Sequence, residues 1–274
     1  MQEIRADVVT LGSVSDNTVI YNALGAVSNG AGTVMLSGAN GQIEARRAVV
    51  RFAVAATIPA GSRVLDAELQ LTNTLGAPSP EDCSLHRLLA SWGEAGSFGA
   101  MGQGSGAPAE PGDTTWLHRF YPDVFWTIPG GDFVSGASAT THVSMDGVWK
   151  WASAQVVKDV QFWLDYPGSD FGWLIKGDEV NLRTNKRFST HEEPNEEMRP
   201  RLVVTFDACP ADLNGDGVVD DADFVVFVFA YNVLDCTDPA MGAGCPADLN
   251  SDGFVDDADF VVFVAAYNEL LCAG

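Results

Sequence analysis

The sequence predicts a mainly β fold: a jelly-roll-type β-sandwich over residues 1–207, followed by a small all-helical domain over residues 208–274. Two observations lead to this prediction. Short strand-like runs separated by turn sequences fill the first 206 residues, which is typical of a sandwich. A unit of 28 residues then occurs twice with few differences, and such near-identity indicates a structural repeat.

The expected strands are short and lie between turns that contain glycine, proline or asparagine. The run at 67–72 alternates, with Ala67, Leu69 and Leu71 on one face and polar residues on the other. One helix is expected at 154–164, where apolar residues recur at helical spacing. The other strand-like runs are 8–11, 18–21, 33–36, 48–54, 84–89, 172–176 and 202–206.

The repeated unit runs from 209 to 236 and returns from 245 to 272, an offset of 36 residues. Each copy holds an acidic loop with side-chain oxygens at positions 1, 3, 5, 9 and 12 and glycine at position 6. A hard divalent cation takes six to eight oxygens, position 6 needs glycine for a sharp turn, and position 7 contributes its backbone carbonyl. The spacing therefore predicts two metal sites. The expected ligands are Asp212, Asn214, Asp216, Val218, Asp220 and Asp223 in the first, and Asp248, Asn250, Asp252, Phe254, Asp256 and Asp259 in the second.

Calcium is the expected ion at both sites. Position 12 is Asp instead of the usual bidentate Glu, which predicts modest affinity and leaves Mg²⁺ as the alternative. An apolar run follows each loop, and we expect a helix there because the last ligand of such a loop lies in the first turn of a helix. A helix that is apolar on all sides must be buried, so we expect the two helices to pack against each other.

Four of the five cysteines lie at the edges of the repeats, where loops of oxygen ligands have no use for them. A helix of about twelve residues is roughly 18 Å long, too long for a disulfide to join the two ends of one repeat. Antiparallel helices would favour the pairs Cys209–Cys272 and Cys236–Cys245, with pairing inside each repeat as the alternative. Paired cysteines imply an extracellular compartment, and Cys83 is left over as a buried thiol.

The formal net charge is −22 and is unevenly distributed. The 13 acidic residues after residue 208 have no Lys or Arg among them, so all 15 basic residues precede them. So little basic surface excludes non-specific binding of nucleic acid. No run of 18 apolar residues exists, so we expect no membrane span. Residues 1–5 do not begin a signal peptide, and we expect that one has been removed from a secreted protein.

The pair of loops and helices over 209–272 resembles a type I dockerin, the duplicated calcium-binding module that attaches extracellular proteins to cohesin domains. The ligand positions match residue by residue. The resemblance implies two bound Ca²⁺ ions and a cohesin-like partner. It also implies that the partner is recognised at loop positions 10 and 11, which are Asp221 and Ala222 in the first copy and Asp257 and Ala258 in the second.

Residues 7–206 resemble the DNRLRE-domain family of secreted β-sandwiches, some of which are carbohydrate-binding modules attached to polysaccharide-degrading enzymes. The resemblance implies the sandwich fold and a polysaccharide ligand. The residues that carry it include DNTVIY at 16–21, RAVVRF at 47–52, LHRLLASWGE at 85–94, FGWL at 171–174, KRFS at 186–189 and RPRL at 199–202.

The sequence contains no catalytic constellation, so we expect no enzyme. The four histidines show no close metal spacing, and there is no GxSxG or phosphate-binding loop. The glutamate pairs at 192–193 and 196–197 are interpreted as a solvated acidic turn. Aromatic faces and forked donors suit sugars, so the candidate glycan-binding residues are Trp149, Trp151, Lys186 and Arg187.

Together these features predict a secreted, non-catalytic structural or adhesion protein that calcium stabilises. It would assemble with other copies of itself into extracellular or cell-surface structures, filaments among them. The alternative is a carbohydrate-binding module that docks onto a cohesin-type scaffold in polysaccharide degradation.

Overall fold

The computed structural model describes residues 6–74, 76–77, 79–100, 103–242, 245–250 and 252–269. The chain forms two compact units. Unit 1 combines Thr205–Gly274 with Met1–Val9 and Ala55–Asp66, and unit 2 combines Thr10–Val54 with Ala67–Val204. Two short segments of the expected first domain therefore group with the C-terminal repeats.

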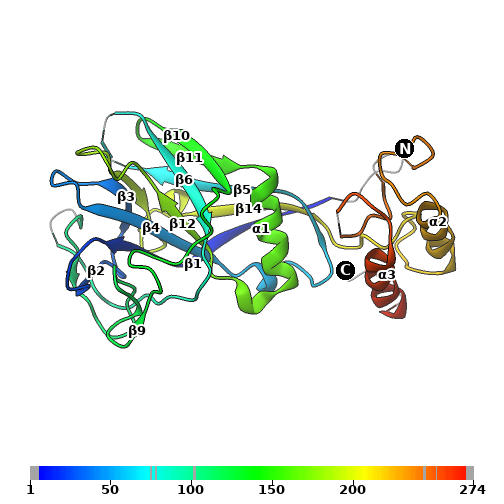
Figure 1. Cartoon of the computed structure of the whole chain (residues 1–274), viewed down its shortest axis with the longest axis horizontal. Coiled ribbons are helices and arrows are strands. Elements are labelled where there is room, and N and C mark those ends of the chain that lie inside the picture. The colour runs from blue at the N-terminus through cyan, green and yellow to red at the C-terminus, as the bar shows by residue number, and fades with distance from the viewer. Residues whose placement is uncertain are drawn as a thin grey trace. The chain divides into compact units, whose positions relative to one another are not determined.

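Fourteen strands lie in the part of the chain that the structure describes, and the mainly β prediction is confirmed (Figure 1). The strands are β1 Asp7–Ile20, β2 Val27–Ser28, β3 Val34–Ala39, β4 Ala45–Phe52, β5 Arg63–Asn73, β6 Glu81–Arg87, β7 Ala107–Pro108, β8 His118–Phe120, β9 Val124–Phe125, β10 Ala139–Val143, β11 Gly147–Ala152, β12 Trp173–Lys176, β13 Lys186–Ser189 and β14 Arg201–Asp207.

Ten of these strands form one sheet in the order β1-β14-β5-β13-β3-β4-β12-β6-β10, with β11 paired to β5. The sheet closes into a barrel-like arrangement because β1 pairs with β4 as well as with β14. The alternation expected at 67–72 is confirmed: Ala67, Leu69 and Leu71 are all fully buried on one face of β5. This face contributes to the apolar core of unit 2.

The predicted helix is confirmed as α1 (Ala154–Asp165), which Ser153 caps by accepting hydrogen bonds from two backbone N–H groups of the first turn. Its buried side includes Trp163, whose ring centre lies 4.4 Å from that of Trp173. Cys83 is a buried free thiol, as expected, and burial raises its pKa to about 12.

The two strands predicted at 8–11 and 18–21 are one continuous strand, so the predicted break is wrong. The register of β1 against β4 shifts between Ser13 and Ser15, which marks a β-bulge. The bulge lets a polar stretch stay in the strand and keeps its ladder with β4. Pairing with a neighbour therefore overrides the turn-like composition of this segment.

Unit 1 contains the helices α2 (Asp221–Tyr231) and α3 (Asp257–Glu269), which confirms that a helix follows each loop (Figure 1). The two helices pack against each other through Phe227 and Phe263, whose ring centres lie 5.1 Å apart. Both phenylalanines are 1% exposed.

The C-terminal end of each helix meets the start of the other. Tyr231 Oη of α2 donates to Asp257 Oδ1 of α3 at 2.6 Å, and Tyr267 Oη of α3 donates to Asp221 Oδ1 of α2. Reciprocal contacts of this kind require antiparallel helices related by a pseudo-twofold axis. Among the described residues, no helix is both long and apolar enough to span a lipid bilayer.

Candidate functional site

The first acidic loop folds its backbone around the carboxylate of Asp212, at loop position 1. Its Oδ1 accepts hydrogen bonds from the backbone N–H of Gly215 at 2.7 Å and of Asp216 at 3.1 Å. Its Oδ2 accepts from Gly217 N–H at 2.8 Å. Gly217 has a φ of +91°, a conformation that favours glycine, so position 6 needs this residue for the turn.

The end of the first loop closes onto its beginning through Asp223, at position 12. This aspartate is fully buried, and its Oδ1 accepts from Asn214 N–H at 2.9 Å. Its Oδ2 accepts from Asp220 N–H at 2.9 Å, while the Asp220 side chain accepts from Ala222 N–H and caps α2. Positions 3, 9 and 12 are thus brought together at the start of the helix.

The second loop repeats this geometry at an offset of 36 residues. Asp248 accepts from Asp252 N–H at 3.1 Å and from Gly253 N–H at 3.0 Å, and Gly253 has a φ of +96°. Asp259 is fully buried and accepts from Asn250 N–H at 3.0 Å. Because two loops with this sequence reach the same conformation, the pattern of oxygen positions is a property of the sequence itself.

The residues of both loops suit a calcium ion. Every side chain at positions 1, 3, 5, 9 and 12 presents oxygen, the donor that hard cations require. Each loop also ends in the first turn of a helix, so an ion held there would connect loop and helix. Two calcium sites with the ligands named above stay a prediction.

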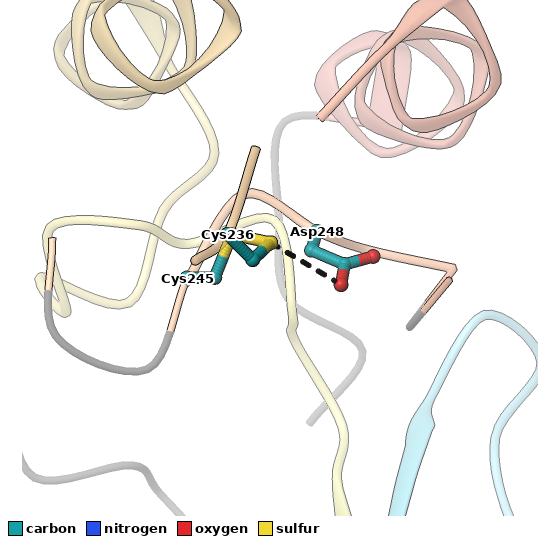
Figure 2. Close-up of side chains that lie close together, drawn as sticks. All are labelled: Cys236, Cys245 and Asp248. Carbon is teal, nitrogen blue, oxygen red and sulfur yellow. Dashed lines mark hydrogen bonds between the residues drawn. A yellow bond between two sulfur atoms is a disulfide. The ribbon is translucent and has the colours of Figure 1, made fainter. Parts of the chain in front are cut away.

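A disulfide joins Cys236 to Cys245, as predicted, with Cα atoms 5.4 Å apart. Figure 2 shows it beside Asp248, whose Oδ2 lies 3.6 Å from Cys236 Sγ. The three side chains lie close enough to share a metal ion, but the disulfide removes both thiolates as ligands. The disulfide therefore acts as a staple next to position 1 of the second loop. The other predicted pair, Cys209–Cys272, lies outside the described residues because Cys272 does.

Replacing both cysteines, Cys236→Ser with Cys245→Ser, is expected to lower the free energy of unfolding of unit 1 by about 2–3 kcal/mol, because the crosslink restricts the unfolded chain. Urea unfolding followed by circular dichroism at 222 nm measures this loss. The variant Cys83→Ala, which removes a cysteine from unit 2, is the control and should leave the unfolding of unit 1 unchanged. Equal midpoints for the double variant and the wild type would contradict a stabilising disulfide.

The outer sides of α2 and α3 are exposed, so the expectation that both helices are buried all round is wrong. Val225 and Val261, which occupy the same position in the two repeats, are each 68% exposed, and Phe229 is 63% exposed. Two helices that pack as a pair cover only one side of each other, and no described residue covers the remaining side. We call the exposed apolar side chains of the two helices the outer face: Phe224, Val225, Val228, Phe229, Phe260, Val261 and Val264. Phe224 and Phe260 also lie against a phenylalanine of the partner helix.

The rim of this outer face is acidic. Asp221 and Asp257 stand exposed at the helix starts, and no Lys or Arg occurs after residue 208. The two aspartates occupy position 10 of their loops, where the resemblance to dockerins leads us to expect contacts with a partner. The sequence does carry a signal for this face. Each apolar run has more apolar positions than a contact between two helices can bury, so some of them must stay exposed.

The candidate glycan residues Trp149 and Trp151 lie on β11, which pairs with β5. Trp151 is fully buried, donates from Nε1 to Cys83 O at 2.8 Å and packs edge-on against Phe188. It belongs to the core and is not available to a glycan. Trp149 is half-buried, and its Nε1 donates to Met145 O at 2.9 Å.

Lys186 is also unavailable to a ligand, because its side chain is fully buried. Its Nζ donates to three backbone carbonyls: Ala77 O at 2.7 Å, Ser79 O at 2.5 Å and Ser144 O at 3.2 Å. The lysine thereby ties two loops to β13. Its neighbour Arg187 is half-buried, and Arg187 Nε has no hydrogen-bond partner among the described residues.

Of the four candidate glycan residues, the structure thus leaves two with any access to solvent, and it does not bring them together with Lys186 at a surface.

Comparison of the chain with protein-family models and with curated proteins found no match.

Proposed function

We propose that this chain is a secreted, non-catalytic assembly protein in which a calcium-loaded, dockerin-like module is carried by a jelly-roll-type β-sandwich. The observation that supports this function best is the outer face of α2 and α3. Exposed apolar side chains gathered on neighbouring helices are typical of protein-binding sites. The face follows the two acidic loops directly, so the loops hold the ends of the helices that form it.

Calcium would offset the negative charge that each loop gathers at its centre. The chain's own residues do the positioning: Asp223 and Asp259 are buried in the first turns of α2 and α3 and bind the backbone of their loops. The direction of each helix is therefore coupled to the conformation of its loop. A rigid pair of helices loses little entropy when a partner covers the outer face.

Charge favours a head-to-tail contact between copies. The outer face has an acidic rim and no basic residue near it in sequence, so two such faces would repel each other. All 15 Lys and Arg residues precede residue 209, and these residues supply the opposite charge. A contact between two different surfaces of one chain can repeat from copy to copy. It produces a ring if the rotation between copies closes, and a filament if it does not.

The test is negative-stain electron microscopy and sedimentation of the protein in calcium and then in EDTA. We expect assemblies that form in calcium and dissolve in EDTA. The double variant Val225→Asp with Val261→Asp should weaken assembly at least tenfold, because it places charge on the outer face at two positions that bury little in unit 1. The control is Val180→Asp, which adds the same charge at a position of unit 2 that is 78% exposed. A wild-type protein that stays monomeric in calcium at high concentration would overturn the proposal.

The second candidate, a carbohydrate-binding module that docks onto a cohesin-type scaffold, is favoured by the same outer face, which also suits a different protein with a basic rim. Its glycan part now depends on Trp149 and Arg187. Calorimetry against acidic and neutral polysaccharides would support it if binding heat appears and is lost in Trp149→Ala. A monomeric chain without binding heat would exclude both candidates.

A further inference from the structure

We infer that unit 2 carries a site for a divalent transition-metal ion such as Zn²⁺, with Asp16, Glu94 and His191 as ligands and Glu192 as the group that orients the histidine. One ligand atom from each of the four side chains lies within 4.8 Å of the others. The group is unrelated to the two acidic loops, which belong to unit 1.

The distances between the ligand atoms lie within about 0.2 Å of those expected in a zinc site. His191 Nδ1 lies 3.2 Å from Asp16 Oδ2 and 3.8 Å from Glu94 Oε1. In a tetrahedral site with bonds of about 2.0–2.2 Å, ligand atoms lie roughly 3.3–3.6 Å apart. His191 Nε2 lies 2.9 Å from Glu192 Oε1, the arrangement in which a carboxylate fixes the orientation of a metal-bound imidazole.

The strongest indication of a missing partner is the carboxylate of Asp16, which is 0% exposed. Its Oδ2 faces the group and accepts from Ser13 Oγ at 3.0 Å and from His191 N–H at 2.9 Å. Its Oδ1 is buried and has no hydrogen-bond partner within the described ranges of the chain. A buried carboxylate is costly to keep charged, and a cation bound at Oδ2 would stabilise the negative charge of the whole carboxylate.

Rigid neighbours hold each of these side chains in place. Asp16 follows the bulge in β1 between Ser13 and Ser15, and such bulges re-aim side chains. The residues before and after Glu94 are fixed because the backbone N–H of each donates a hydrogen bond. Glu94 Oε1 itself accepts from Asp16 N–H at 3.2 Å. His191 comes two residues after the end of β13, and the intervening Thr190 donates from Oγ1 to Gly32 O at 2.7 Å. The site is therefore formed before any ion arrives.

The charge of the group also favours a cation. Asp16, Glu94 and Glu192 have His191 as their ion-pair partner, and no Lys or Arg pairs with them in the described part of the chain. Three carboxylates thus share one imidazole, and a bound cation would add further positive charge to the group.

The donor set indicates the kind of ion. Calcium and magnesium take oxygen ligands almost alone, whereas an imidazole nitrogen with two carboxylates suits zinc and its first-row neighbours. A water molecule would complete four-coordination. The glutamate at 192, interpreted from sequence as part of a solvated turn, is half-buried against His191 instead.

The test titrates ZnCl₂ into metal-free full-length protein by calorimetry, with calcium present to occupy the acidic loops. We expect one zinc ion per chain and at least tenfold weaker binding in His191→Gln and in Glu94→Gln, which is the smallest loss expected when part of a metal site is removed. The control is His142→Gln, because His142 Nδ1 also lies near a carboxylate, 2.7 Å from Asp82 Oδ1, but is exposed. It should leave zinc binding unchanged.

Two further measurements keep the outcome clear. Thermal unfolding of each variant in EDTA, followed by tryptophan fluorescence, checks that unit 2 is folded, and only folded variants are compared. The loop variant Asp212→Ala with Asp248→Ala should retain the zinc ion, so failure of the calcium proposal does not affect this one. Zinc binding that survives in both His191→Gln and Glu94→Gln, or a third calcium ion in place of zinc, would overturn the inference.

Discussion

Removing calcium, by EDTA or by Asp212→Ala with Asp248→Ala, is expected to destabilise unit 1 and leave unit 2 folded. Each aspartate occupies position 1 of its loop, where both of its oxygens already organise the backbone. An ion present at 100 times its Kd stabilises a folded protein by about 2.7 kcal/mol, so two sites contribute about 5 kcal/mol. That is the largest single effect expected for this chain.

Two spectroscopic signals separate the units. All seven tryptophans lie between residues 92 and 173, inside unit 2, whereas α2 and α3 lie in unit 1. EDTA should therefore lower the helical signal at 222 nm and the unfolding temperature measured there, with tryptophan fluorescence unchanged. The control variant Asp238→Ala with Asp66→Ala removes two acidic residues outside the loops and should keep the calcium response. A helical signal that melts at the same temperature with and without EDTA would refute a structural role for calcium.

Replacing Lys186 by methionine is expected to destabilise unit 2 by about 3 kcal/mol or more, because each buried carbonyl left without a donor costs about 1–3 kcal/mol. The ammonium group serves three such carbonyls, and methionine offers them nothing. Urea unfolding followed by tryptophan fluorescence measures the change, since the signal comes from unit 2 alone.

The matched control is Lys150→Met. Lys150 Nζ lies 2.8 Å from Glu68 Oε1, but its side chain is 58% exposed, so we expect a change of at most about 1 kcal/mol. If Lys186→Met unfolds at the same urea concentration as the wild type, the hydrogen bonds of the buried lysine do not stabilise unit 2. The carbonyls would then have to find donors elsewhere.

Features that depend on neighbouring residues in sequence could be predicted well. The loop conformation follows from oxygens at alternate positions and glycine at 217 and 253, all within twelve residues. The helices α2 and α3 follow from the loops, and the pair Cys236–Cys245 follows from an antiparallel arrangement of those helices. In each case the chain itself holds the interacting groups close together.

Features that depend on distant neighbours could not be predicted. The side chain at Lys186 has the composition of a ligand-binding group, and only the loops folded over β13 make it part of the interior. His191 and Asp16 are 175 residues apart, and their contact exists because β1 and the end of β13 meet in the same unit. No local pattern marks either residue as a metal ligand.

The sequence by itself determined the two acidic loops, their helices, one disulfide and a mainly β first part, because spacing and alternation act over short distances. The tertiary structure decided which apolar side chains remain on the surface and which charged ones are buried. Packing depends on the area that each partner covers: one helix covers one side of another, so the outer face of α2 and α3 stays open. A closed sheet together with the loops folded over it covers side chains from several sides, which buries Asp16 and Lys186 as well as the apolar core.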